Sequence, residues 1–358
     1  MRNFRGPLIT ALVTAGVEVF ALAPDYNDDD RRAIEGLGAR PVDYRMRRAE
    51  IDPVGDLSAM AQLVGQLRAI RPDMALSFAV KPVIYGTLAA WIARVPRRFA
   101  LIEGLGHVFI NEPGLRSGAL RWVVSKLYRL ALTAAERTLF LNDDDRADFV
   151  SARLVSAGKA MTVGAIGVDL ATWTVVPPVS SPLTFIFVGR LLREKGIFEF
   201  IDAARAIKAE HPEVGFVVLG SPDSNPSSVT AERVGGWVDE GLITWPGHVD
   251  VRPWLARSTV FVLPSYREGV PRSTQEAMAL GKPVITTDVP GCRDTVVDGD
   301  NGFLVPSKDA PALQAAMLRF VADRGLIATM GRRSRQIAEA SFDVNAANVR
   351  MMNVLCSR

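Results

Sequence analysis

The chain has little of what metal centres and disulfide frameworks require. Its 358 residues include only two cysteines, Cys292 and Cys356, and three histidines, His107, His211 and His248, with no metal-ligand spacing among them. Zinc sites draw on clustered Cys and His side chains, and disulfide frameworks on several paired cysteines. We therefore expect no metal site, no disulfide and a reducing cytosolic environment.

Other signals are missing as well. No uninterrupted apolar stretch reaches the ~18 residues that suggest a membrane-spanning helix. No basic-aromatic motif of a nucleic-acid reader occurs, so nucleic acid is not an expected partner. No GxGxxG follows a predicted strand, which disfavours a dinucleotide dehydrogenase. What is present is ordinary for a globular protein, with 48% apolar and 23% charged residues and enough length for two cores.

The basic residues are concentrated in one part of the chain. The net charge is only +3, but nine basic residues face three acidic ones between Lys81 and Arg137. This excess suits an anionic membrane surface or an acidic lipid headgroup.

A helix expected over 117–135 carries part of this charge on one face. One face holds Leu120, Val123, Val124, Leu127 and Leu130, and the other holds Arg121, Trp122, Lys126, Tyr128 and Arg129. The second face is basic and aromatic, so it fits a headgroup layer, and it fits a merely solvated helix surface equally well.

Strands and helices alternate along the whole chain, which predicts α/β layers around parallel sheets. The pattern restarts after a linker, so we expect two Rossmann-like domains that face each other across a cleft. The expected ranges are 1–175, 176–341 and, for a C-terminal helix that packs back on the first domain, 342–358. Ligands of such sheets bind beyond the carboxyl ends of the strands.

The first domain begins directly with a helix, expected over 7–15. A Rossmann-like unit normally opens with a central buried strand, whose loss leaves a slot with unpaired backbone on both sides. We therefore expect the first strand to be missing, so that either the natural reading frame begins upstream or the N-terminal domain is impaired.

The most informative segment is 261–306, which reads as strand, loop, helix and strand. Glu268 lies in the loop and Glu276 on the helix, and Gly269 and Pro271 shape the turn between them. The N-terminus of a helix that follows a strand presents free N–H groups to a phosphate. Carboxylates on either side can accept hydrogen bonds from sugar hydroxyls. The spacing of the glutamates alone means little, but this context predicts a nucleotide-sugar pocket.

A second segment, FVGRLLREKG (187–196), supplies positive charge. The predicted strand ends at Gly189, and Arg190 and Lys195 flank the loop before the next helix. Two fixed cations near a helix start suit a diphosphate. Alone, the segment reads as a solvated basic loop; together with the glutamate pair of the same domain, it favours a diphosphate site.

Together these segments resemble retaining glycosyltransferases of the GT-B fold, from family 4, which includes bacterial polysaccharide and lipid-linked-sugar transferases. Further similar segments are NFRGPLI (3–9), IEGLGHVFI (102–110), GVD (167–169) and DGDNGFLVP (298–306). The branch with the most similar motifs comprises undecaprenyl-diphosphate-linked sugar transferases of the α-1,3-N-acetylgalactosaminyl type.

The resemblance implies a role for each matching residue of the second domain. Arg190 and Lys195 would hold the donor diphosphate, and Glu268 would hold the hydroxyls of the donor sugar. These three are the expected catalytic residues. The ribose would meet Glu276, and the sugar, phosphates and base would meet backbone at Gly189, Gly247, His248, Gly269, Val270 and Arg272. No cofactor and no metal would be required, and the donor would be a UDP-sugar, with GDP still open.

On the acceptor side, the resemblance points to Arg5 and His107. His107 is either functional or a packed loop histidine. The small-residue loop that usually follows the first strand in this family is absent together with that strand.

The expected function is transfer of a sugar from a nucleotide sugar to a lipid-linked or oligosaccharide acceptor in bacterial surface polysaccharide synthesis. We expect a cytoplasmic protein, peripheral on the inner face of the plasma membrane. One alternative is a UDP-sugar epimerase of the same architecture, which the shortage of histidine disfavours. Another is a nucleotide-sugar-binding protein that has lost turnover.

Overall fold

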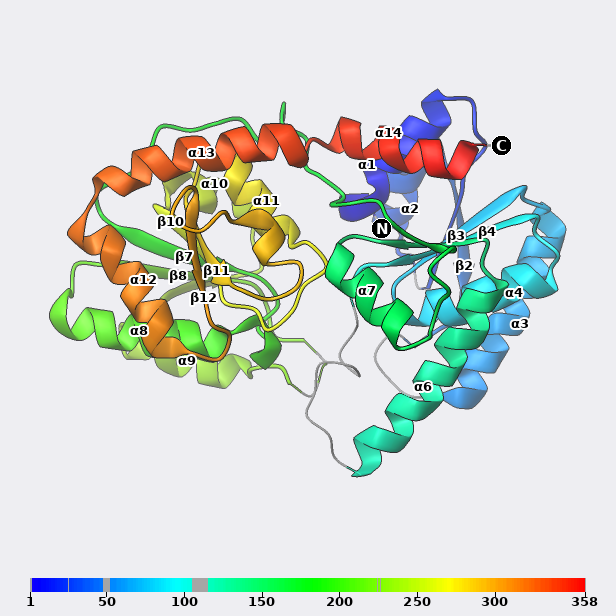
Figure 1. The fold of residues 1–358 in the computed structure, drawn as a ribbon, viewed down its shortest axis with the longest axis horizontal. Helices are drawn as coiled ribbons and strands as arrows, with labels where there is room; N and C mark the ends of the chain where they lie inside the picture. Colours follow the sequence, from blue (N-terminus) through cyan, green and yellow to red (C-terminus); the bar gives the residue numbers. More distant parts are fainter. Residues whose placement is uncertain are drawn as a thin grey trace. The chain divides into compact units, whose positions relative to one another are not determined.

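The protein is described by a computed structural model that covers residues 2–24, 26–47, 52–104, 115–223, 225 and 227–357. The chain divides into two compact units (Figure 1). Unit 1 combines residues 1–166 with 344–358, and unit 2 spans 167–343. The boundary therefore falls before the expected position at 175/176. The helix α14 (Val344–Cys356) belongs to unit 1, where it packs against α1 (Arg2–Thr14).

Unit 2 is a doubly wound sheet whose strands are all parallel. The order is β12-β11-β10-β7-β8-β9, so the direction of winding reverses between β7 and β10. Except for the edge strand β9, which has no buried residue, the strands are short apolar runs with buried centres, as expected where helices cover both faces. Their bounds are β7 Thr184–Val188, β8 Gly215–Leu219, β9 Thr244–Gly247, β10 Val260–Leu263, β11 Val284–Thr287 and β12 Gly302–Val305.

Three helices of unit 2, α9, α10 and α12, begin at a residue whose side chain caps them. Thr230, Asp250 and Asp309 each accept a hydrogen bond from a first-turn backbone N–H, which satisfies a donor that the helix itself leaves free. The helices are α8 Ile197–Glu210, α9 Ala231–Asp239, α10 Val251–Arg257, α11 Arg272–Ala279, α12 Ala310–Ala322 and α13 Gly325–Ser341, with short 3-10 turns η2 Arg193–Lys195 and η3 Arg293–Thr295.

Unit 1 carries two parallel sheets in its described residues. One pairs β1 (Phe20–Pro24) with β2 (Arg40–Tyr44). The other has the order β3-β4-β5-β6, with bounds β3 Met74–Phe78, β4 Arg97–Ile102, β5 Arg137–Phe140 and β6 Ala160–Thr162. The remaining helices are α2 Asp28–Gly36, α3 Pro53–Ile70, the π-helix η1 Pro82–Gly86, α4 Thr87–Ile92, α6 Leu115–Ala134 and α7 Asp143–Ser151. Within the described ranges, no helix is both long and apolar enough to cross a bilayer.

The sheet of unit 1 is interrupted between β1 and β3, because no pairing joins these two strands in the part of the chain that the structure describes. Every residue of β3 is only half-buried, whereas Phe99–Ile102 of β4 are fully buried. The interruption lies where the sequence predicts the slot. That the chain is short of a strand there stays a prediction.

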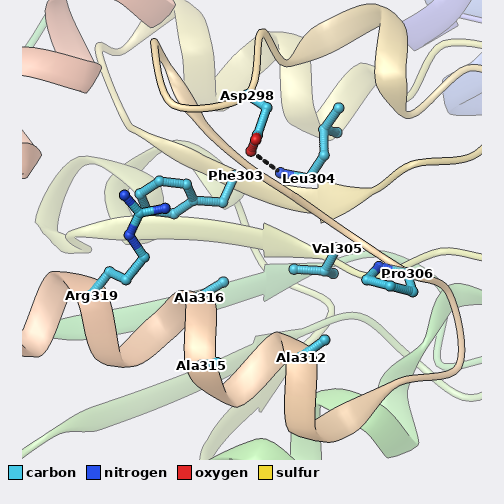
Figure 2. A pocket seen from close by; sticks show the side chains of 9 residues that line it. All are labelled: Asp298, Phe303, Leu304, Val305, Pro306, Ala312, Ala315, Ala316 and Arg319. Atoms are coloured by element: carbon cyan, nitrogen blue, oxygen red, sulfur yellow. Dashed lines mark hydrogen bonds between the residues drawn. The ribbon is translucent and has the colours of Figure 1, made fainter.

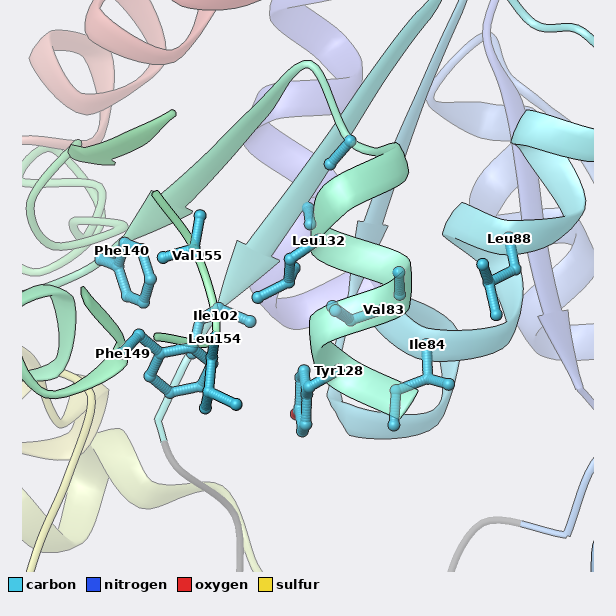
Figure 3. Close-up of a cluster of buried hydrophobic side chains, with 13 residues drawn as sticks. Val83, Ile84, Leu88, Ile102, Tyr128, Leu132, Phe140, Phe149, Leu154 and Val155 are labelled. Carbon is cyan, nitrogen blue, oxygen red and sulfur yellow. The ribbon is translucent and has the colours of Figure 1, made fainter. Parts of the chain in front are cut away.

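The core of unit 1 corrects the expected orientation of α6. Tyr128, expected on the outer face, is only 1% exposed and packs edge-on against Phe149, with ring centroids 5.6 Å apart (Figure 3). Val123 and Leu130, expected on the buried face, are 44% and 55% exposed. The helix is rotated because Tyr128 and the small Ala131 face the core cluster around η1 and β5. Nothing is described of the side chains of residues 115–121.

Candidate active site

The candidate site of unit 2 forms at the carboxyl ends of β7 and β10, where the winding of the sheet reverses. Gly196, with φ of 73°, lies so near β10 that a Cβ would approach the Pro264 carbonyl oxygen to 2.0 Å. Only glycine permits this contact. It brings the 3-10 turn η2 against the end of β10, and Lys195 at the end of η2 forms an ion pair with Glu268.

Glu268 is held from several sides. Ser265 Oγ donates to its Oε1 at 2.7 Å, and its own backbone N–H donates to the Pro290 carbonyl at 3.1 Å. A Cβ on Gly291 would lie 2.2 Å from the Glu268 carbonyl oxygen, so the loop after β11 packs directly on this residue. The Glu268 side chain is 11% exposed, which leaves a fixed and accessible carboxylate.

A thiol lies close to this carboxylate. Burial, and after it the charge of Glu268, raise the pKa of Cys292 to about 12, against the opposing effects of two threonine hydroxyls and Lys195. Because the neutral thiol persists at physiological pH, Cys292 is an apolar packing residue here rather than a nucleophile.

The second acid, Glu276, lies on α11. The helix begins after Pro271, and the Nε of Arg272 in its first turn donates to Glu276 Oε1 at 2.9 Å. Burial raises the pKa of Glu276, Arg272 lowers it, and Asp250 raises it again. The effect of Asp250, which caps α10, indicates that Glu276 lies near the loop after β9.

That loop contains the two residues expected near the base. Gly247 ends β9 with φ of 82°, and its carbonyl accepts from the Gly220 N–H at 3.1 Å. His248 is exposed. The loops after β8 and β9 are therefore joined where they begin.

The other expected cation, Arg190, follows Gly189 at the end of β7. Its Nη1 lies 3.4 Å from Asp223 Oδ2, and its side chain is 61% exposed. Close packing fixes the backbone rather than the side chain, since a Cβ on Gly220 would lie 1.9 Å from the Gly189 carbonyl oxygen. Arg190 thus lies at the site with most of its side chain exposed to solvent.

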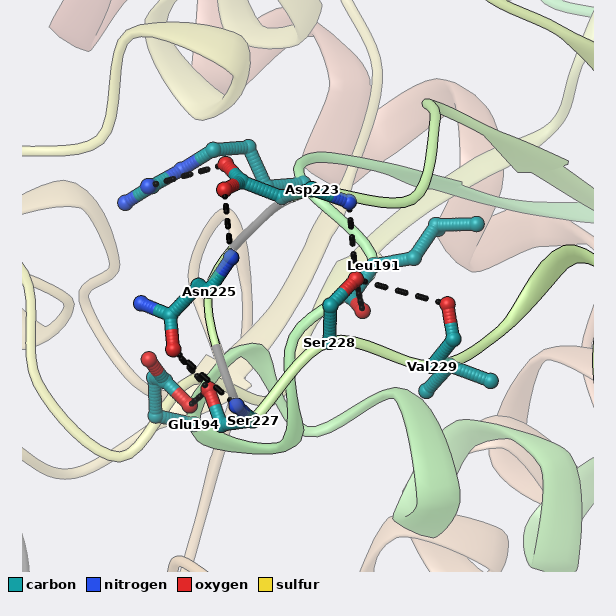
Figure 4. Close-up of polar contacts among 8 residues, drawn as sticks. Leu191, Glu194, Asp223, Asn225, Ser227, Ser228 and Val229 are labelled. Carbon is teal, nitrogen blue, oxygen red and sulfur yellow. Dashed lines mark hydrogen bonds and ion pairs between the residues drawn. The ribbon is translucent and has the colours of Figure 1, made fainter. Parts of the chain in front are cut away.

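Polar contacts tie the loop after β8 to the turn that carries Lys195 (Figure 4). The Ser227 hydroxyl donates to Glu194 Oε2 at 2.5 Å, and the Asp223 N–H donates to Ser228 Oγ at 2.8 Å. Ser228 in turn contacts the Leu191 carbonyl at 3.4 Å. The loop that holds the partner of Arg190 is thereby fixed to the turn that precedes Lys195.

A shallow hollow of about 300 Å³ lies elsewhere in unit 2, between β12 and α12 (Figure 2). Arg319 covers the ring of Phe303 there, with its Cζ 3.8 Å from the ring centroid. None of the lining residues is a candidate site residue, so we assign the hollow no part in the site.

In unit 1, the structure describes one of the two expected acceptor-side residues. Arg5, on α1, is 3% exposed and forms an ion pair with Glu103, directly after β4. His107 lies outside the described residues. Sequence reasoning missed Glu103, although the segment IEGLG places an acid at the end of a predicted strand, where ligands of parallel sheets bind.

The arrangement in unit 2 can hold a diphosphate and a polyhydroxylated group side by side. Two cations and the N-terminus of α11 lie at the same edge of the sheet as two carboxylates. Among the described residues, no group of His, Cys, Asp and Glu side chains could hold a metal ion.

Two sequence families cover most of the chain. Residues 2–165 match the family described as "Glycosyl transferase 4-like domain", and residues 182–323 match "Glycosyl transferases group 1". Both matched ranges fall within the observed units. The chain is a glycosyltransferase with a domain of each of these families.

The glycosyltransferase is similar along nearly its whole length to a curated enzyme of Campylobacter jejuni. This relative is N,N'-diacetylbacillosaminyl-diphospho-undecaprenol α-1,3-N-acetylgalactosaminyltransferase, 29% identical over 96% of the chain and 92% of the relative. A capsular polysaccharide glycosyltransferase of Staphylococcus aureus, CapM, is 24% identical over 82% of the chain and 79% of the relative. The glycosyltransferase thus groups with enzymes of bacterial polysaccharide biosynthesis.

Solved structures agree on the GT-B fold. The sucrose-phosphate synthase of Thermosynechococcus elongatus superimposes with a TM-score of 0.78 at 23% identity, over 98% of this chain and 91% of that one. Anabaena HepE in complex with UDP-glucose gives 0.77 at 19% identity, over 99% and 95%. At these identities the likeness concerns the fold alone.

Proposed function

We propose that this glycosyltransferase moves a sugar from a UDP-sugar to a lipid-linked or oligosaccharide acceptor, with retention of the anomeric configuration. The observation that carries the proposal is the ion pair of Lys195 with Glu268 at the carboxyl ends of β7 and β10. A cation for a diphosphate and an anion for sugar hydroxyls meet there within one hydrogen bond of each other. The UDP and UDP-glucose complexes of HepE support the choice of nucleotide.

In the proposed reaction, the bond between the anomeric carbon and the oxygen of the β-phosphate breaks. The negative charge that develops on the diphosphate is stabilised by Lys195, by Arg190 and by the backbone N–H groups of the first turn of α11. The acceptor hydroxyl attacks the same face of the sugar, and its proton passes to the departing phosphate oxygen. Glu268 holds hydroxyls of the donor sugar, and Glu276 holds the ribose hydroxyls.

We propose that these groups replace a metal ion in neutralising the diphosphate. Lys195 is the stronger candidate because its side chain is only 19% exposed, and water screens it less than Arg190. Transfer should therefore persist in excess EDTA. Loss of activity in EDTA and its recovery with Mg²⁺ or Mn²⁺ would contradict this part of the proposal.

The donor can be tested by thermal shift with a panel of UDP-sugars and GDP-sugars. A ligand at 100 times its Kd stabilises the native state by about 2.7 kcal/mol, which is readily measured as a rise in Tm. We expect UDP-sugars to raise the Tm and GDP-sugars not to. A rise with GDP-sugars alone would overturn the choice of UDP.

Turnover is tested with a lipid-diphosphate-linked sugar as the acceptor and with the variant Glu268→Gln. The matched control is Glu240→Gln, because Glu240 lies in the same unit in an exposed pair with Arg205. We expect loss of transfer in the first variant and wild-type transfer in the second. Equal activity of both would show that Glu268 is not the sugar-binding acid.

We further propose that α6 places unit 1 on an anionic membrane surface, where a lipid-linked acceptor resides. Trp122 is 64% exposed, and the Nζ of Lys126 lies 5.5 Å from its ring centroid. Val123, Arg129 and Leu130 are exposed on the same helix. An amphipathic aromatic ring beside cations suits the boundary between lipid headgroups and acyl chains.

Vesicles test this surface. The wild type should bind vesicles that contain phosphatidylglycerol and should bind pure phosphatidylcholine much less. Charge reversal of both Lys126 and Arg129 should weaken binding, whereas Arg205→Glu in unit 2 should not. Undiminished binding of the double variant would remove α6 from the proposal.

A further inference from the structure

A buried cation and an accessible carboxylate meet at the carboxyl end of the main sheet of unit 1. Arg5 is 3% exposed, its Cζ lies 4.9 Å from the ring centroid of Phe78 at the end of β3, and its Nη2 donates to Glu103 Oε1. The Glu103 side chain is 30% exposed against 4% for that of Arg5. Because the cation is covered, a ligand at this edge of the sheet would meet the carboxylate.

The same strand carries a second Arg–Glu pair at its opposite end, and the two differ in construction. Arg97, the first residue of β4, donates from Nε and Nη2 to Glu136 at 3.1 and 2.9 Å. Its Nη1 donates to the carbonyls of Leu355 and Ser357 at 2.6 and 2.7 Å, which fastens α14 to the sheet. All three nitrogens of this guanidinium donate hydrogen bonds within the fold.

Arg5 is not used in this way. Its Nε is buried and has no hydrogen-bond partner among the described residues. A buried donor without a partner costs stability, as does the desolvation that lowers the pKa of this guanidinium. If the Arg5–Glu103 pair served only to stabilise the fold, we would expect all nitrogens of Arg5 to be hydrogen-bonded, as they are in Arg97. The arrangement of Arg5 instead keeps Glu103 fixed and facing outward.

We propose that Glu103 binds a hydroxyl of the acceptor sugar, with Arg5 as its positioning residue. The inference rests on the proposed function and names the acceptor class, a sugar carried on an isoprenyl diphosphate. A carboxylate accepts a strong, charge-assisted hydrogen bond from a hydroxyl. An unpaired carboxylate would repel the diphosphate of such an acceptor, and Arg5 cancels that charge from beneath.

A second carboxylate at the same edge of the sheet is also paired with a cation. Lys81, in the turn after β3, donates to Asp56 at 2.7 Å and to the Arg47 carbonyl at 2.8 Å. Asp56 is buried, and Ala79 in the same turn has φ of 67°, a strained value for a residue with a side chain. Glu103 and Asp56 are thus each paired with a cation.

The experiment compares Glu103→Gln with Glu136→Gln, the carboxylates of the two Arg–Glu pairs at opposite ends of β4. Transfer is measured from the best UDP-sugar to N,N'-diacetylbacillosaminyl-diphospho-undecaprenol, together with the Kd for UDP and the Tm. For Glu103→Gln we expect kcat/KM for the acceptor to fall about 10- to 100-fold, chiefly through KM, with the UDP affinity unchanged. For Glu136→Gln we expect the acceptor kcat/KM within about twofold of wild type.

Arg5 is tested by rescue. Arg5→Met should lose acceptor kcat/KM as Glu103→Gln does, and Arg5→Lys, which keeps the cation, should recover most of it. The proposal is overturned if Glu103→Gln has the acceptor kcat/KM of wild type or loses its cooperative unfolding transition. It is also overturned if the acceptor kcat/KM of Glu136→Gln falls as much as that of Glu103→Gln. Wild-type protein that binds UDP but does not glycosylate this acceptor class would also overturn it, whereas absent UDP binding would refute the proposed function itself.

Discussion

Replacement of Lys195 by Met is the most direct test of the diphosphate site. The Lys195 side chain is 19% exposed and is held at the carboxyl end of β10 by the contact of Gly196 with Pro264. A hydrogen bond to a charged group contributes about 1.5–3 kcal/mol net, and about 1.4 kcal/mol corresponds to a factor of ten. The UDP affinity of Lys195→Met should therefore fall about 10- to 150-fold.

Arg190 offers an internal comparison of magnitude. Its side chain is 61% exposed, and exposed ion pairs typically contribute about 0.2–1 kcal/mol. Arg190→Met should weaken UDP by less than about sixfold. The order of the two effects thus follows from solvent exposure, although the two side chains carry the same charge.

Isothermal titration calorimetry with UDP and with UMP checks the reasoning. UMP lacks the β-phosphate, so Lys195→Met should bind UMP nearly as wild type does. A Kd for UDP within twofold of wild type would refute the assignment of Lys195. An equal loss for UMP would show that the substitution disturbs the nucleoside part of the site rather than the diphosphate part.

Three further outcomes follow from burial and contacts. Since burial raises the folded-state pKa of Glu276, its contribution to stability is present at low pH and is lost as the pH rises above about 4.5, its ordinary value, so Glu276→Gln should flatten unfolding free energy against pH in denaturant titrations. Of the two thiols, exposed Cys356 should react with iodoacetamide in native protein and buried Cys292 only after unfolding; native labelling at both would contradict the structure. Ser265→Ala removes the 2.7 Å hydrogen bond to Glu268, so it should lower kcat more than UDP affinity; equal losses would contradict a purely orienting role.

The strands of unit 2 could be predicted from the sequence because their apolar runs are buried on both faces. The two strands predicted within 261–306 are β10 (Val260–Leu263) and β11 (Val284–Thr287). The elements α2 and β2 were missed. The first turn of α2 consists of three aspartates, and in its nine residues only Ile34 is buried, so little apolar periodicity was available.

The orientation of α6 was wrong for a related reason. Apolar residues extend beyond the predicted face to Tyr128, Ala131 and Leu132, so the sequence does not fix which part of this apolar surface is buried. Which side is buried depends on the neighbours: Tyr128 lies in a core with Phe140 and Phe149, from elements that follow it in the chain. Tertiary packing decided the rotation.

The sequence was sufficient to predict which residues form the candidate site of unit 2, but not which of them contact one another. Lys195 and Glu268 could be assigned to one site because both follow strands of one sheet, yet their direct ion pair joins positions 73 residues apart. The Arg5–Glu103 pair spans 98 residues, and no local pattern connects its members. Such contacts depend on the order of the strands.

The ion pair of Lys195 with Glu268 should affect how tightly UDP binds. Without a ligand, the Glu268 carboxylate is paired with Lys195, the cation that would bind the diphosphate. Glu268 and the diphosphate therefore compete for Lys195. When the β-phosphate binds Lys195, Glu268 is released to accept hydrogen bonds from the donor sugar. UDP without a sugar should therefore have to displace Glu268 from Lys195, and it has no sugar hydroxyls that could donate hydrogen bonds to the released carboxylate.

Glu268→Gln separates these effects. A neutral amide competes more weakly for Lys195, so the variant should bind UDP more tightly than wild type, by about fivefold if the pair contributes about 1 kcal/mol. The same variant loses the charged partner of the sugar hydroxyls, so its kcat/KM for the UDP-sugar should fall about 10- to 150-fold. Calorimetry with UDP and a transfer assay measure the two changes, which must have opposite signs. Weaker binding of UDP by the variant would show that Glu268 supports the diphosphate site instead of competing with it.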